Sequence, residues 1–233
     1  MNEEDRHSHA LDAELITDPD LKAQREVSNG LKQFDAVAEQ VEYWSHPERP
    51  FKLRPSAILG LHRIALLGLT GLAGTYRPAG VEIVGSKHHP VGAHLVPGLV
   101  EEMTEYVNEN WGKKSPIHLC AYVLWRLNWI HPFVDGNGRT ARAVSYLVLC
   151  VGLGYRLPGR KTIPEQIADD KKPYYLALEM ADQGFDKTAQ PDLSEMEQLI
   201  EGLLAKQLVE VLHKATGNTH TCLLYTSPSP RDA

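Results

Sequence analysis

The chain has 233 residues, of which 42% are hydrophobic and 23% are charged, and its formal net charge is −6. This length is enough for one sizeable core with an accessory piece. The negative net charge excludes a chain that is basic overall, as nucleic-acid-binding domains commonly are. Every apolar run is interrupted well before the ~18 residues of a membrane-spanning helix, and no apolar signal segment precedes them. We therefore expect a soluble cytoplasmic protein with neither a membrane span nor a nucleic-acid partner.

The first fifty residues are predicted to contain a flexible start and then one helix. Residues 1–16 are polar and acidic, and we expect them to be flexible. Residues 17–19, Thr-Asp-Pro, are a helix-start signal, because a capping side chain precedes a proline in the first turn. Apolar residues then recur at helical spacing to about Tyr43. Residues 17–50 are therefore expected to form an N-terminal helix and loop that pack on the core.

Residues 51–219 are predicted to form the main helical domain. One segment, 81–84, alternates as a short strand and ends at a Gly-Ser turn. The other periodic segments are helical, at about 55–66, 97–111, 116–130, 139–151, 174–183 and 193–214. The predicted fold class is therefore all-α, a helical core with a small β-hairpin flap.

The composition breaks abruptly at the end of the chain. Residues 220–233 contain Ser-Pro repeats and show no helical period. They resemble a translated sequencing adapter, so we expect them to be an artefactual, disordered tail. The sequence leaves open whether the natural protein has a further C-terminal domain in its place.

The densest group of chemically useful residues is the stretch 131–142, HPFVDGNGRTAR, between two apolar helical runs. His131 ends a buried helix, where an imidazole can be held in one orientation and act as a base near neutral pH. Asp135 supplies a hard oxygen ligand of the kind that Mg²⁺ prefers.

The second half of this stretch is suited to an anion. Gly136, Asn137 and Gly138 let backbone N–H groups approach an anion closely, and they lead into a helix N-terminus, where the helix dipole favours phosphate. Arg139 and Arg142 lie three positions apart, hence on one helix face, where their guanidinium groups can bind phosphate oxygens. The order of the stretch is thus base, metal ligand, anion site and phosphate clamp.

Each residue of this stretch also has an ordinary structural explanation. A histidine at a helix end is usually a capping group, an aspartate before glycine a turn, and an arginine pair a solvated face. Taken singly, these explanations are favoured; four coinciding features within twelve residues make chance improbable. Residues 136–141 also match a relaxed dinucleotide fingerprint, but that motif must follow a strand, and here a helical run precedes it.

HPFVDGNGRTAR resembles the full signature of the Fic family, H-x-F-x-D/E-G-N-G-R-x-x-R. The resemblance extends over roughly residues 24–205. Its further supports are Leu61-His62 before the flap, Tyr76-Arg77 and 81–85 in the flap, His89-Pro90 in its later arm, and 174–178 in the helix after the active site.

The resemblance implies a protein adenylyltransferase, which transfers AMP from Mg-ATP to a Ser, Thr or Tyr hydroxyl of a target protein. It makes His131 the catalytic base and Asp135 the Mg²⁺ ligand. It assigns the nucleotide site to Phe133, Gly136, Asn137, Gly138, Arg139 and Arg142. The target segment would add a strand to the flap around Val81–Gly85.

One family feature has no clean copy in this chain. Many Fic proteins carry an inhibitory helix with S/T-x-x-x-E-G/N, whose glutamate pairs with the second arginine of the motif. Glu26 lies in the corresponding helix, but it stands three positions before Asn29 instead of directly before Asn or Gly. Glu26 is therefore a candidate inhibitory residue with the wrong spacing, and we expect its removal to change the basal rate less than about threefold.

Two alternatives stay open from the sequence. One is a Fic-fold enzyme with other chemistry, namely transfer from another nucleotide, phosphotransfer or AMP removal. The other is a non-catalytic regulator that keeps the fold. The sequence leaves open the target protein, the nucleotide preference and whether the chain forms homo-oligomers.

Overall fold

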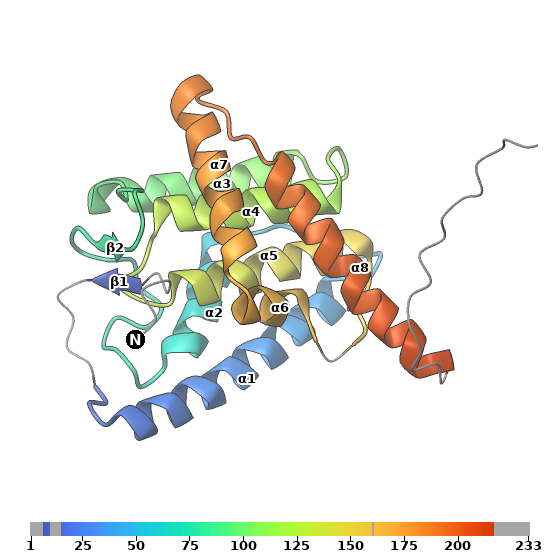
Figure 1. Cartoon of the computed structure of the whole chain (residues 1–233), viewed down its shortest axis with the longest axis horizontal. Helices are drawn as coiled ribbons and strands as arrows, with labels where there is room; N and C mark the ends of the chain where they lie inside the picture. The colour runs from blue at the N-terminus through green and yellow to red at the C-terminus, as the bar shows by residue number, and fades with distance from the viewer. Residues whose placement is uncertain (1–6, 10–14, 160, 217–233) are drawn as a thin grey trace, which may run out of the picture.

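The computed structural model describes residues 7–9, 15–159 and 161–216. Two helices, α4 (Pro116–Ile130) and α5 (Asn137–Leu153), pack against each other at the centre of the fold. α1 (Pro19–Trp44) and α2 (Pro55–Leu66) pack on α5, whereas α7 (Lys172–Thr188) and α8 (Ser194–Thr216) pack on α4 or on each other (Figure 1). The all-α prediction is confirmed.

Local sequence signals explain where the central helices begin. The Ser115 side chain accepts a hydrogen bond from the His118 N–H, and Pro116 occupies the first turn of α4, where its missing N–H costs nothing. α4 and α5 are buried on most of their faces, because neighbouring helices cover them. The segment 131–136 that joins them is consequently held between two rigid elements.

α1 is joined to α2 by buried amide side chains as well as by apolar packing. The Asn29 amide donates to the carbonyls of Ala65 and Leu67, at 3.2 and 2.9 Å. The Gln33 amide donates to the Leu61 carbonyl at 3.1 Å. The Ala65 carbonyl lies in the last turn of α2 and the Leu67 carbonyl just beyond it, where carbonyls lack helical partners, whereas the Leu61 carbonyl lies within the helix. These bonds fix the rotation of α1 about its axis and so fix the position of Glu26, which lies on the same helix.

The two strands come from segments far apart in the sequence. β2 (Glu82–Val84) pairs antiparallel with β1 (His7–His9), with Ser8 opposite Ile83 (Figure 1). The sequence predicted a hairpin formed within the flap, whereas the described partner of β2 is the N-terminal segment. Residues 1–16 were expected to be flexible; within them, 7–9 form this strand, and 1–6 and 10–14 lie outside the described residues.

Most helices lie where the sequence predicted them, and one was missed. α3 (Val96–Glu109) follows a single 3₁₀ turn at Ala93–Leu95. α6 (Ile163–Asp169) was not predicted, although its signal is visible: Thr162 and Glu165 form a capping box, with a proline in the first turn. The tail at 220–233 lies outside the described residues. Within the described ranges, none of the helices has both the length and the apolar character to span a membrane.

Candidate functional site

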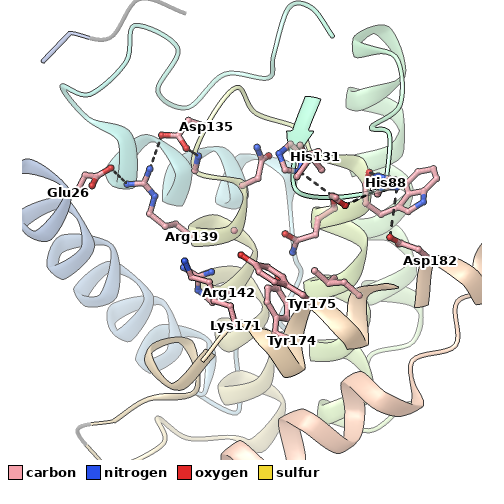
Figure 2. Close-up of a pocket in the computed structure, with 18 of the residues that line it drawn as sticks. Glu26, His88, His131, Asp135, Arg139, Arg142, Lys171, Tyr174, Tyr175 and Asp182 are labelled. Carbon is pink, nitrogen blue, oxygen red and sulfur yellow. Dashed lines mark hydrogen bonds and ion pairs between the residues drawn. The ribbon is translucent and has the colours of Figure 1, made fainter. Parts of the chain in front are cut away.

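A cavity of about 600 Å³ opens where α1, the flap, the 131–142 stretch and α7 meet. Its volume falls in the range of small-molecule sites. Of the residues singled out from the sequence, those that line it are Glu26, His131, Asp135, Gly136, Asn137, Gly138, Arg139 and Arg142 (Figure 2). The structure therefore places Glu26 of α1 in one cavity with seven residues of the 131–142 stretch.

His131 is held in an unusual backbone conformation at the end of α4. Its φ and ψ are 52° and 61°, a left-handed conformation that few residues other than glycine adopt. Its Nδ1 lies 3.3 Å from the Asn128 carbonyl, which can only accept, so Nδ1 carries the proton and Nε2 is the basic nitrogen. Burial lowers the pKa of His131 from 6.5 to about 4. The imidazole is therefore neutral at pH 7, as a general base must be.

The backbone conformation of His131 is stabilised by Arg77, a buried side chain. Arg77 Nε donates to the His131 carbonyl at 2.8 Å, and the Arg77 N–H donates to the Pro132 carbonyl at 2.9 Å. Its Nη1 donates to the Ala79 carbonyl and its Nη2 to the Val91 carbonyl. One guanidinium thus ties both ends of the flap to the turn that carries the candidate base. The sequence placed Arg77 only in a flap motif and did not predict this positioning role.

Asn137 closes the loop between the two central helices. Its Oδ1 accepts from the Phe133 N–H at 2.9 Å, and its Nδ2 donates to the Phe133 carbonyl at 2.8 Å. The Asn137 side chain therefore shapes the loop, and Asn137 also lines the cavity at the start of α5. Phe133, which the resemblance assigned to the nucleotide site, is fully buried and is not one of the lining residues.

His62 supports the same loop from the side of α2. Its Nδ1 accepts from the Gly74 N–H at 2.9 Å, so its Nε2 carries the proton and donates to the Asp135 carbonyl at 3.0 Å. Its ring stacks on Phe133 with centroids 3.7 Å apart and an interplanar angle of 5°. Burial lowers the pKa of His62 to about 4, so it supports the loop as a neutral group. Phe133 and His62 together hold Asp135 in place.

Gly136 is the position where this loop tolerates no side chain. Its φ is +75°, and a Cβ there would clash with Leu66 Cδ2. We expect Gly136→Ala to lower the free energy of unfolding by about 3 kcal/mol, since left-handed strain and overpacking each cost roughly 1–3 kcal/mol. Urea unfolding at an unchanged m-value measures this.

A matched control for Gly136→Ala exists on α1. Gly30 is an exposed helical glycine, and nothing lies within 4 Å of a Cβ built on it. Gly30→Ala should leave stability unchanged or raise it by up to ~1 kcal/mol, because alanine is the better helix former. Equal stabilities of the two variants would contradict the strain assigned to Gly136.

Arg139 lies between two carboxylates at the mouth of the cavity (Figure 2). Its Nη2 lies 2.9 Å from Asp135 Oδ2, and its Nη1 lies 3.3 Å from Glu26 Oε1. The sequence considered Glu26 as a partner of Arg142; the structure pairs it with Arg139, the first arginine of the motif. The Asp135 and Glu26 side chains are 56% and 39% exposed, so these ion pairs are screened by water and contribute little.

The far wall of the cavity comes from α7 and the residue before it. Lys171, Tyr174, Tyr175 and Asp182 lie there (Figure 2). Lys171 adds a third cation to Arg139 and Arg142 among the lining residues, which suits a polyanionic ligand. The sequence identified 174–178 only as a family helix. Its adjacent tyrosines, one buried and one half-buried, were the available signal that this helix borders the cavity.

The donor set near Asp135 suits a metal ion shared with a ligand. No group of three or more His, Cys, Asp or Glu side chains that could hold a metal ion occurs among the described residues. Mg²⁺, however, is typically bound by one or two carboxylates together with substrate phosphates. A carboxylate at the edge of a cavity with three cations fits this second arrangement and does not fit an all-protein metal cage.

The sequence matches a known family in the segment that builds this cavity. The model of the Fic/DOC family matches residues 52–149. A protein adenylyltransferase Fic of Drosophila persimilis is 34% identical over 101 residues, which are 40% of this chain and 18% of that protein. A Fido domain-containing protein of Dictyostelium discoideum is 36% identical over 90 residues, which are 39% of this chain and 57% of that protein. The match thus spans less than two thirds of either relative.

Solved structures share the fold over most of the chain. A Fic domain-containing signalling protein of Bacteroides thetaiotaomicron aligns with a TM-score of 0.70 and 22% identity, covering 88% of this chain and 78% of that chain. Fic-1 of C. elegans aligns with a TM-score of 0.64 and 22% identity, covering 87% and 55%. The matched segment contains α2 to most of α5, with His131, Asp135 and both motif arginines. Residues 52–149 thus match the Fic/DOC family, and the chain has the Fic fold.

Proposed function

We propose that the protein transfers AMP from Mg-ATP to a hydroxyl side chain of a protein. The observation that carries this proposal is the position of His131, a neutral and buried base at the wall of a cavity that also holds three cations and a helix N-terminus. A base, an anion site and a nucleotide-sized cavity are together what nucleotidyl transfer requires.

In the proposed reaction, His131 Nε2 accepts the proton of the attacking hydroxyl. The hydroxyl oxygen forms a bond to the α-phosphorus, the bond from that phosphorus to the oxygen bridging to the β-phosphate breaks, and pyrophosphate leaves. Arg139 and Arg142 bind the phosphate oxygens, and the N–H groups in the first turn of α5 contribute to the same anion site. Asp135 would hold Mg²⁺, which neutralises phosphate charge when bound.

The comparisons support this proposal at the level of the family. The relatives from Drosophila are named protein adenylyltransferases. A Bartonella effector protein, BepC, was solved with AMPPNP bound and shares the fold, with a TM-score of 0.53 and 16% identity. An ATP-like ligand therefore occurs in a protein of the same fold, and the cavity lined by the 131–142 stretch is where we place it in this chain.

The test uses ATP labelled at the α- or the γ-phosphate, incubated with the purified protein and a cell lysate. AMP transfer predicts protein-bound label from α-labelled ATP only. Label from γ-labelled ATP would show phosphotransfer, and no label from either would contradict the proposal. The matched control is the His131→Asn variant, because asparagine tolerates the left-handed backbone but is no base near neutral pH.

Glu26 is expected to weaken ATP binding only slightly. Its carboxylate competes with phosphate for Arg139, but the pair is partly exposed, and such pairs contribute roughly 0–1 kcal/mol. We expect Glu26→Gln to tighten ATP binding by less than about fivefold, given ~1.36 kcal/mol per tenfold. Calorimetry measures this, with the exposed α1 residue Glu39 as control in Glu39→Gln. A tightening of tenfold or more would make Glu26 an inhibitory switch.

A further inference from the structure

The carbonyl groups at the end of α4 lack their usual helical partners. In a continued helix, the carbonyls of Asn128 and Trp129 would each accept from the N–H group four positions later. For Asn128 that position is Pro132, which has no N–H. For Trp129 it is Phe133, whose N–H donates to a side-chain oxygen of α5. Both carbonyls, which lie just before His131, therefore require donors from side chains.

One of these donors comes from the segment that follows β2. The Asn128 carbonyl faces Nδ1 of His131 itself, at 3.3 Å. The Trp129 carbonyl lies 2.7 Å from Nε2 of His88. Because a carbonyl can only accept, this nitrogen carries a hydrogen and donates it. His88 thus completes the end of the helix that carries the candidate base, two residues before that base.

Further contacts join His88 to β2 and to α7. The His88 N–H donates to Ser86 Oγ at 3.2 Å, and the Ser86 N–H donates to the Ile83 carbonyl at 3.2 Å. Asp182 faces the other ring nitrogen, with its Oδ2 4.0 Å from His88 Nδ1 (Figure 2). The Asp182 carboxylate is itself fixed, because Trp125 Nε1 donates to its Oδ1 at 2.9 Å. His88 is therefore a link among β2, α4 and α7.

This link lies at the wall of the cavity that holds the candidate base. The members of the link that line the cavity with His131 are Ile83, Ser86, His88, Trp129 and Asp182. The position of a base matters strongly, since a misplacement of about 1 Å can cost roughly 10²-fold in rate. A contact that fixes the last turn before His131 therefore bears on the rate of proton transfer.

We propose that His88 is a positioning residue, which holds His131 in the geometry for proton transfer by donating to the Trp129 carbonyl. This inference rests on the proposed function. His88 takes no proton from the hydroxyl, because its Nε2 is used in the bond to the carbonyl. The same bond joins β2 to the base, since the segment after β2 cannot shift without withdrawing a donor from the end of α4. A target segment that adds to β2 is thereby held in register with His131.

Two substitutions of His88 separate its hydrogen bond from its ring. His88→Phe keeps a ring beside Trp129, whose centroid lies 5.8 Å from that of His88, but removes the donor. His88→Gln loses the ring and places an amide donor near the position of Nε2. At saturating ATP, we expect label transfer from α-labelled ATP to lysate protein to slow by roughly 10–100-fold in His88→Phe and by less than about threefold in His88→Gln.

The rescue by glutamine assigns the effect to the hydrogen bond, because glutamine is no base near neutral pH. An equal loss of rate in both variants would overturn the positioning role, and so would an unchanged rate in His88→Phe. The matched control is His89→Ala, since His89 is the exposed neighbour of His88 and is not one of the lining residues. This control should transfer label like the unaltered protein.

ATP affinity separates positioning from direct contact with the nucleotide. Calorimetry should show a change of less than about twofold in either His88 variant, because a positioning residue acts on the rate and not on ground-state binding. A loss of ATP affinity in His88→Phe as large as the loss of rate would make His88 a nucleotide contact and overturn the inference.

NMR of the histidine rings tests the same inference without any activity. In the unaltered protein, the Nε2 hydrogen of His88 and the Nδ1 hydrogen of His131 should be protected from exchange with water. We expect the His131 signal to persist in His88→Gln and to be lost by exchange in His88→Phe. An unchanged His131 signal in His88→Phe overturns the inference and leaves AMP transfer standing. If the signals behave as expected but the unaltered protein transfers no label, the proposed function fails and the positioning contact stands.

Discussion

Replacing His131 with asparagine is expected to lower the rate of AMP transfer by roughly 10²–10⁴-fold, the usual contribution of a general base. The reason is that Nε2 of this buried, neutral imidazole is the atom that we propose to accept the proton of the attacking hydroxyl. ATP affinity should change little, because the phosphates are bound by other residues. Single-turnover label transfer measures the first quantity and calorimetry the second.

The pH dependence of the same reaction gives an independent test. Because burial holds the pKa of His131 at about 4, the base is neutral at every pH above about 5. The acid limb of kcat/KM should therefore lie near pH 4, not near the ordinary histidine value of 6.5. An acid limb between pH 6 and 7 in a folded protein would contradict the environment assigned to His131.

Folding must be followed over the same pH range, because the same histidines couple it to protons. His62 and His131 both have a folded-state pKa of about 4, below the unfolded value of 6.5. The unfolded chain binds more protons between these values, so stability falls as the pH drops from 6.5 towards 4. Circular dichroism at each pH separates loss of the base from loss of the fold.

Replacing Asp135 with alanine is expected to abolish Mg²⁺-dependent ATP binding. The Asp135 carboxylate lines the cavity directly before the glycine that precedes α5. A magnesium ion shared with phosphates depends on one or two such carboxylate ligands. The variant also removes a partner of Arg139, so weak metal-independent binding should persist or improve slightly. Calorimetry with and without Mg²⁺ distinguishes these two effects.

Asp186, an exposed residue of α7 that does not line the cavity, gives the matched control. Asp186→Ala removes the same charge and should bind Mg-ATP like the unaltered protein. If Asp135→Ala also binds Mg-ATP normally, Asp135 is a turn residue and the magnesium assignment is wrong.

The sequence by itself determined most of the helices and the order of the chemical groups. The α1 and α4 starts follow from local signals, an aspartate or serine cap and a proline in the first turn. Arg139 and Arg142 share a helix face because three positions make nearly one turn. These are short-range relations, fixed by backbone geometry, and the twelve residues of the motif contain all of them.

Tertiary structure decided which distant groups meet. Glu26 is 113 residues from Arg139 in the chain, and its partner depends on how α1 is rotated against α2 and α5. That rotation is fixed by the amides of Asn29 and Gln33, whose acceptors the sequence does not show. The sequence could therefore place Glu26 in the helix that resembles the inhibitory one but could not choose between the two arginines.

The same reason explains the other differences. Phe133 stands in the motif beside nucleotide-site residues, yet it stacks on His62, because the loop turns its ring into the core. The partner of β2 comes from residues 7–9, since an exposed strand edge pairs with whichever extended segment the fold brings beside it. The residue types of a motif indicate its chemistry from a short stretch of sequence. The orientation and the partners of these residues depend on packing between segments that lie far apart in the sequence.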